Sequence, residues 1–88
     1  MFTDWFKIRF SYRGEEFEFV IDCNHLDTND ENWFWRIGLR VGDEYYDADV
    51  FGSIVDGELT TDYPFGVDVY LNDDDIDTIE DVEILCGE

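Results

Sequence analysis

Residues 33–41 read Trp-Phe-Trp-Arg-Ile-Gly-Leu-Arg-Val and are the most apolar stretch of the chain. A large apolar side chain occupies every second position, and these positions are Trp33, Trp35, Ile37, Leu39 and Val41. A period of two is the repeat of a β-strand that buries one of its faces. We therefore expect residues 33–41 to form a strand at the centre of an antiparallel sheet.

The next stretch predicts a partner for this strand. Gly42-Asp43-Glu44 supplies turn residues, and residues 45–51 alternate again, so the two stretches are expected to form a hairpin. The side chains expected to point inward are Tyr46, Ala48 and Val50. Those expected on the outer face are Asp47 and Asp49, flanked by Tyr45 and Phe51.

The N-terminal residues predict a second hairpin. Residues 5–13 alternate strictly, Gly14 and Glu15 supply a turn, and Phe17, Phe19 and Ile21 continue the apolar face. The outer face of this hairpin places Lys7, Arg9 and Arg13 near Glu16, Glu18 and Asp22. Opposite charges on neighbouring strands attract, so we expect these basic residues to be paired within the protein.

The remaining segments carry weaker patterns. Residues 23–32 are predicted to be a loop, and residues 52–64 a long connection or an irregular short hairpin. Residues 65–71 alternate as a fifth strand, and Val82, Ile84 and Cys86 indicate a last one. Between them, Asn72 is expected to cap a short helix with Asp73, Asp74 and Asp75 in its first turn and Ile76 and Ile79 on its buried side. The predicted fold is a single α+β domain, residues 1–88, with a twisted antiparallel sheet of about five strands and one short helix.

Charge is the second strong signal. The chain has 24 acidic residues against five Lys and Arg, for a net charge of −19, and no Lys or Arg follows residue 44. Aromatic residues make up 18% of the chain, which is too many for a disordered acidic tail. Such a field opposes direct nucleic-acid binding and favours a basic protein partner. No signal peptide or membrane span is recognised, so we expect a cytoplasmic protein without membrane contact, monomeric or a small homo-oligomer.

The sequence offers only weak candidates for a catalytic or metal site. Residues 72–83 have the length of a calcium-binding loop, but Asp77 stands where the loop requires glycine, so an EF-hand is excluded. Looser cation binding among Asp73, Asp74, Asp75 and Asp77 stays open. Cys23 and His25 lie two residues apart in a polar loop, which is weak evidence for a nucleophile and its base. We predict no enzyme, no cofactor and no metal site, and the two cysteines are either reduced thiols or one disulfide.

The acids themselves are the candidate site. Same-face residues repeat about every 6.6 Å along a strand and strands lie about 4.8 Å apart, so Asp47, Asp49 and Asp68 are expected to form a lattice of carboxylates. Exposed tyrosines would supply apolar anchors. The predicted partner-binding residues are Asp43, Glu44, Tyr45, Asp47, Asp49, Asp56, Glu58, Asp62, Asp68, Tyr70, Asp73, Asp74, Asp75, Asp77 and Glu80.

In size, net charge and its mixture of β pattern with carboxylates, the chain resembles the small acidic anti-CRISPR and anti-restriction inhibitors of phages and mobile elements. The resemblance implies a DNA-mimicking surface that blocks a basic nucleic-acid-handling protein, such as a defence nuclease or CRISPR effector, in the cytoplasm of a host cell. The chain is also similar in kind to acidic immunity proteins that block basic nuclease toxins. A general protein-interaction module and a halophile-type acidic domain without a specific partner are the alternatives, the latter because 15 Asp accompany one Lys.

Overall fold

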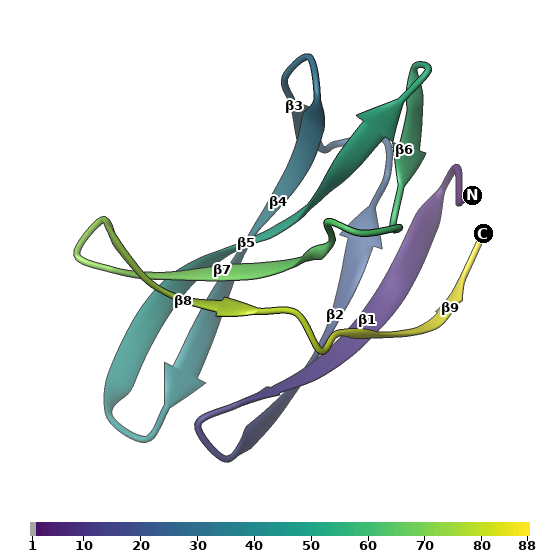
Figure 1. Ribbon diagram of the computed structural model, residues 1–88. Helices are drawn as coiled ribbons and strands as arrows, with labels where there is room; N and C mark the ends of the chain where they lie inside the picture. Colours follow the sequence, from purple (N-terminus) through teal and green to yellow (C-terminus); the bar gives the residue numbers. More distant parts are fainter. Residues whose placement is uncertain (1) are drawn as a thin grey trace.

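Two antiparallel β-sheets pack face to face in the computed structural model, which describes residues 2–88 (Figure 1). The smaller sheet has the strand order β2-β1-β9, and the larger has the order β3-β4-β5-β7-β8, with β6 added to β5. The strands are β1 (Trp5–Tyr12), β2 (Glu15–Asp22), β3 (Asp27–Thr28), β4 (Asn32–Val41), β5 (Glu44–Val55), β6 (Glu58–Thr60), β7 (Gly66–Leu71), β8 (Asp74–Ile79) and β9 (Glu83–Gly87).

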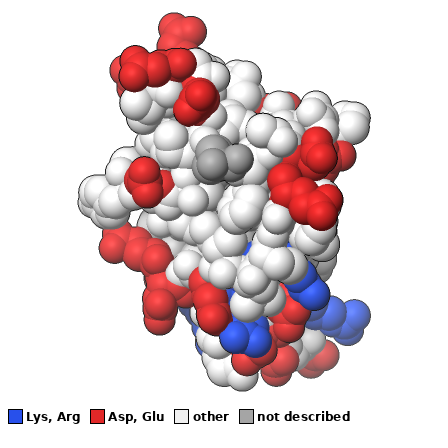
Figure 2. All heavy atoms as spheres, turned by 90° about the vertical axis from the view of Figure 1, so that its right-hand side faces the viewer, with Lys and Arg blue, Asp and Glu red and all other residues white. Residues whose placement is uncertain are grey.

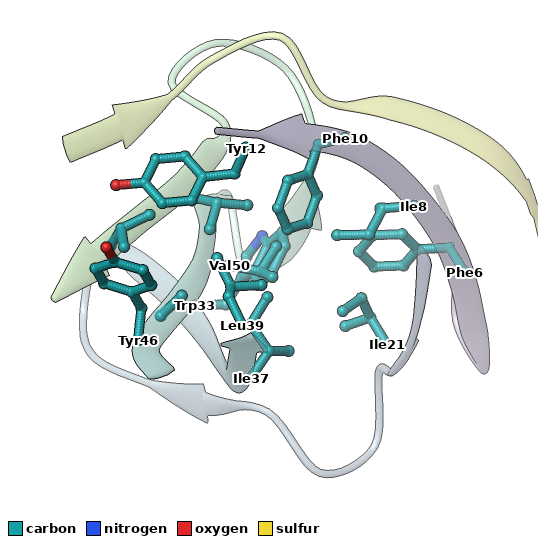
Figure 3. Packing of buried hydrophobic residues seen from close by; sticks show 13 residues of the cluster. Phe6, Ile8, Phe10, Tyr12, Ile21, Trp33, Ile37, Leu39, Tyr46 and Val50 are labelled. Carbon is teal, nitrogen blue, oxygen red and sulfur yellow. The ribbon is translucent and has the colours of Figure 1, made fainter. Parts of the chain in front are cut away.

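The core fills the space between the two sheets. From the smaller sheet Phe6, Ile8 and Phe10 point inward, toward Trp33 and Leu39 of the larger one (Figure 3). Trp33 is fully buried, and its indole Nε1 donates a hydrogen bond to the carbonyl of Thr60, 2.9 Å away. Burial of these apolar side chains is the main force that holds the sheets together. The inward positions expected on residues 33–41 and 45–51 are confirmed as buried or half-buried.

Two-residue turns connect most of the hairpins. Both central residues have positive φ in the β1–β2 turn (Arg13 50°, Gly14 84°) and in the β7–β8 turn (Asn72 53°, Asp73 68°). Positive φ at both positions is the mark of a type I′ turn, whose twist matches that of the flanking strands. These turns therefore fix the register of each hairpin.

The predicted helix after Asn72 is wrong, because these residues are the β7–β8 turn and the strand β8. Asn and Asp tolerate the left-handed backbone conformation better than other non-glycine residues, so Asn72-Asp73 closes a hairpin where a helix cap was expected. The spacing of Ile76 and Ile79 misled the helix prediction, since a β-bulge between the β7–β8 pairs shifts the alternation of β8 at this point. The protein is all-β, and the α+β assignment is corrected accordingly.

The expected single sheet of about five strands is also wrong. The chain forms two sheets because the apolar face of the β1–β2 hairpin packs across β4, β5 and β7 instead of extending one sheet. The central strand of the larger sheet is β5, whereas β4 lies next to its edge. Residues 52–64 contain the short β5–β6 hairpin, closed by Asp56-Gly57.

Candidate acidic interface

Basic side chains compensate much of the negative charge on the outer face of the smaller sheet, where Glu16, Glu18 and Glu83 lie near Lys7 and Arg9. Lys7 Nζ lies 3.1 Å from Glu18 Oε1, and Arg9 lies 2.7 Å from Glu83 and 3.9 Å from Glu16. The cross-strand pairing predicted for Lys7 and Arg9 is therefore present. These basic side chains are occupied by carboxylates of their own sheet.

The outer face of the larger sheet is arranged differently. Asp47 and Asp49 of β5 lie opposite Tyr70 and Asp68 of β7, respectively. On the other side of β7, Asp75 of β8 lies opposite Tyr70. Tyr70 is thus surrounded by four aspartates, and we call this group the Tyr70 cluster: Tyr70, Asp47, Asp49, Asp68 and Asp75. The carboxylate lattice expected from the sequence exists at this place.

Two of the four aspartates are held by neighbours. Arg36 on β4 donates from Nε to Asp49 Oδ1 at 2.6 Å, and Thr78 Oγ1 donates to Asp68 Oδ1 at 2.9 Å. Among residues 2–88, Asp47 and Asp75 take part in no salt bridge. Both are exposed and lie opposite Tyr70 on the two neighbouring strands, so they are available to an external cation.

Two causes, burial and neighbouring charge, shift the pKa values of Asp68 and Tyr70 in the cluster. Burial raises the pKa of Asp68, and the charges of Asp75 and Asp49 raise it further, while the hydrogen bond from Thr78 opposes them. The pKa of Tyr70 is raised by burial and then by Asp68, Asp49 and Asp75, against a smaller opposite effect of Arg36. Burial disfavours a charge of either sign, whereas the neighbouring carboxylates disfavour further negative charge and would favour a cation.

The other predicted acids do not join this cluster. Asp43, Glu44, Asp73 and Asp74, with the 62%-exposed Tyr45, lie in or beside the β4–β5 and β7–β8 turns at one end of the larger sheet. Asp56, Glu58 and Asp62 lie toward the opposite end, because β5 runs twelve residues, roughly 36 Å, between the two ends. Glu80 lies in the β8–β9 connection. The fifteen predicted residues therefore form several separate acidic regions.

Asp77 has a structural role. Tyr12, which is buried on β1, donates its hydroxyl to Asp77 Oδ2 at 2.6 Å, and an Arg13 nitrogen lies 3.7 Å from the same oxygen. Asp77 thus links β8 of one sheet to β1 of the other. On a regular strand Asp75 and Asp77 would face the same way, and the bulge between them makes them face opposite ways. Among residues 2–88, no group of three or more His, Cys, Asp or Glu side chains could hold a metal ion.

The loop after β2 shows no activated thiol. His25 Nδ1 lies 2.6 Å from Asp22 Oδ2, while burial, with smaller contributions from Asp22 and Asp4, raises the pKa of Cys23. A raised pKa lowers the fraction of thiolate, the reactive form of cysteine. Cys23 and Cys86 are both free thiols.

Arg36 is the site residue that the sequence prediction missed. A two-residue turn pairs Val41 with Glu44, and counting back from this pair places Arg36 opposite Asp49. The two-residue turn Gly42-Asp43 is therefore sufficient to predict the register of the β4–β5 hairpin from the sequence. Arg36 and Asp49 also line a hollow of about 470 Å³ with Asp27 and Phe34, which adjoins the Tyr70 cluster on the same face.

Figure 2 shows one face of the molecule. In its upper part acidic side chains appear without basic ones, whereas basic side chains lower down are interleaved with acidic ones. Among residues 2–88, no helix long and apolar enough to cross a membrane is present.

No family model, no curated protein and no solved structure matches the chain.

Proposed function

We propose that this protein is an inhibitor that binds a basic, nucleic-acid-handling protein and occupies its nucleic-acid site. The proposal places the Tyr70 cluster at the centre of the contact. It is carried by one observation: Tyr70 lies among four aspartates on the outer face of the larger sheet. On the outer face of the smaller sheet, in contrast, Lys7 and Arg9 compensate much of the negative charge.

The cluster has the chemistry that recognises arginine. A guanidinium group stacks on aromatic rings and forms paired hydrogen bonds with carboxylates. Tyr70 supplies the ring, and Asp47 and Asp75 on either side supply carboxylates that no internal cation holds. Arginines that contact phosphates in a nucleic-acid site would meet equivalent oxygen acceptors here.

The charge per length of the protein is close to that of a duplex. The net charge of −19 is spread over a longest dimension of 40 Å, about one charge per 2.1 Å, against about one per 1.7 Å of duplex axis. A groove that accepts DNA would therefore meet a similar charge density. Charge of this kind sets the rate of association and the class of partner, while anchors such as Tyr70 set much of the affinity.

The test compares three immobilised forms of the protein in a lysate rich in nucleases and defence complexes, after removal of nucleic acid. The first is the natural chain. The second replaces the cluster acids with asparagine, at Asp47, Asp49, Asp68 and Asp75. The third is a control of equal net charge, −19 + 4 = −15, that replaces exposed acids elsewhere with the matching amides, at Asp30, Asp56, Glu58 and Asp62.

The proposal expects a basic protein that is retained by the natural chain and the control, is lost from the cluster variant, and is released by excess duplex DNA or molar salt. Equal loss from both variants would show that only net charge matters. A captured protein that neither excess duplex DNA nor molar salt releases would favour a general interaction module. A halophile-type domain would retain nothing and would melt far more easily at low salt than in molar salt.

A further inference from the structure

Strand β2 is an open edge of the smaller sheet. It pairs with β1 along its whole length, from Glu15 opposite Tyr12 to Asp22 opposite Trp5, and has no strand on its other side. The edge strand β8 carries a bulge, the β1–β9 pairing is also irregular, and β3 has only two residues. Bulges and shortness protect edges from pairing with other chains, and β2 has neither.

The free backbone groups of β2 can be assigned. The two-residue turn makes Tyr12 and Glu15 a hydrogen-bonded pair, and such pairs alternate along an antiparallel ladder. The backbone groups of Glu16, Glu18 and Val20 therefore point away from β1. Among residues 2–88, no backbone hydrogen bond between separate elements uses these three residues.

The inner face of β2 is incompletely covered. Phe17 and Phe19 point toward the core but remain half-buried, and their rings stack with that of the buried Phe10 at centroid distances of 5.7 and 6.0 Å. A half-buried Trp35 lies on β4, the strand of the larger sheet that β2 approaches. An added strand beside β2 would cover the two phenylalanines with every second side chain.

The charge on the outer face of β2 favours a basic strand at this edge. Glu16 and Glu18 point outward with side chains 63% and 42% exposed. Glu18 is paired with Lys7 at 3.1 Å, whereas the nearest cation to Glu16 is Arg9 at 3.9 Å, which already binds Glu83 more closely. A second copy of this chain would bring its own glutamates against these and add a net charge of −19. Like charges on paired strands repel, so a second copy is disfavoured.

We propose that β2 binds an extended segment of a partner in which Lys or Arg alternates with apolar residues, adding a strand to the smaller sheet. The apolar residues cover Phe17 and Phe19. The basic residues pair with Glu16 and share Glu18 with Lys7. Main-chain hydrogen bonds to Glu16, Glu18 and Val20 supply affinity, as in other cases of strand addition. The inference rests on the proposed function only in that the partner is basic. The β2 edge is a separate surface from the Tyr70 cluster.

The test uses the whole protein and a short synthetic peptide in which lysine and valine alternate, followed by amide hydrogen exchange. The expected result is slowed exchange at Glu16, Glu18 and Val20. Peptides that alternate glutamate with valine, or that hold the same lysines and valines in two blocks, should leave these amides unprotected. Protection that rises with protein concentration in the absence of peptide would assign the edge to a second copy and overturn the proposal.

Variants localise the contact. Reversing two charges with Glu16→Lys and Glu18→Lys should weaken peptide binding at least about tenfold, because attraction becomes repulsion. The matched control, Glu58→Lys with Asp62→Lys, has the same net charge and should change the affinity for the peptide less than about threefold. Val20→Pro removes a free N–H without breaking the β1 ladder and should abolish binding. Equal loss in the charge-reversed pair and its control would overturn the proposal even if the proline variant failed to fold.

The two proposals fail separately. If the peptide leaves β2 unprotected while the Tyr70 cluster variant still loses its captured protein, strand addition is wrong and the inhibitor proposal stands. If the peptide protects β2 while the cluster variant retains the captured protein as well as its control does, the inhibitor site is wrong and strand addition stands.

Discussion

Replacing Asp68 with asparagine should stabilise the protein. The Asp68 carboxylate lies opposite Asp49, diagonal to Asp75, and its pKa is raised by burial and by both of these charges. Asparagine keeps an oxygen that accepts the hydrogen bond from Thr78, which is 2.9 Å long in the natural protein. The substitution therefore removes a repelled charge while it retains the contact.

The size of the gain follows from the geometry of the sheet. Asp75 is diagonal to Asp68 and lies roughly 7–8 Å away, which gives a repulsion of about 0.5–0.6 kcal/mol in a water-like dielectric. Arg36 offsets most of the effect of Asp49, so Asp75 dominates. A neutral side chain also costs less to bury, whereas the hydrogen bond from Thr78 to a neutral amide oxygen is weaker than the bond to a carboxylate. Together these effects leave a gain in the free energy of unfolding of about 0.5–1 kcal/mol at low salt.

Urea unfolding of the natural chain, Asp68→Asn and the control Asp62→Asn measures this gain. Because the pKa of Asp68 is raised on folding, the folded chain binds more protons than the unfolded chain in the window that begins near its ordinary value of 3.8. Stability from this group therefore falls as pH rises through that window. The gain in Asp68→Asn should be complete at neutral pH and absent below about pH 3.8. It should be smaller in 1 M salt, where the screening length is about 3 Å, because salt screens the repulsion by Asp75 but leaves the effect of burial.

The result that refutes this reasoning is specific. If Asp68→Asn is no more stable than Asp62→Asn at neutral pH, or if its gain is the same in dilute buffer and in 1 M salt, the four aspartates do not form an unfavourable field around Tyr70. The cluster would then lack the electrostatic basis for binding a cation.

Three further predictions concern the fold. Tyr12→Phe should lower the free energy of unfolding by about 1–2 kcal/mol, because the hydroxyl bonds the charged Asp77, whereas Tyr63→Phe, at a side chain 86% exposed, should leave unfolding in urea unchanged. Gly52→Ala should cost about 2–3 kcal/mol or prevent folding, as judged by circular dichroism, because the added methyl group would collide with the buried Trp33 indole. The melting temperature of the natural chain should rise with salt as the repulsion within a net charge of −19 is screened, and a flat or falling curve would contradict this.

The strands were predictable where alternation is regular, and the errors arise where register is interrupted. Residues 33–41 and 5–13 were assigned from their period of two, which the structure confirms. Asn72-Asp73 fits both a helix cap and a type I′ turn, and the sequence does not show that β7 needs an antiparallel partner. The Asp56-Gly57 dipeptide, in contrast, is a recognised hairpin signal that predicts the β5–β6 turn.

The acidic site was predictable only in part, for a related reason. Asp47, Asp49 and Asp68 were placed on one outer face because their strands alternate without interruption. Asp77 was misplaced because the bulge in β8 turns it toward Tyr12. The separation of Asp43 from Asp56 depends on β5 running unbroken across the sheet, and the weak pattern after Phe51 concealed that length.

Carboxylate labelling of the captured complex tests the central claim most directly. Carbodiimide modification, read by mass spectrometry, reports which carboxylates a bound protein covers. We expect Asp47, Asp68 and Asp75 to be protected in the complex and exposed again when duplex DNA displaces the partner, while Asp56 and Glu58 react equally in both states. Protection at Asp56 and Glu58 with an unprotected Tyr70 cluster would contradict the account.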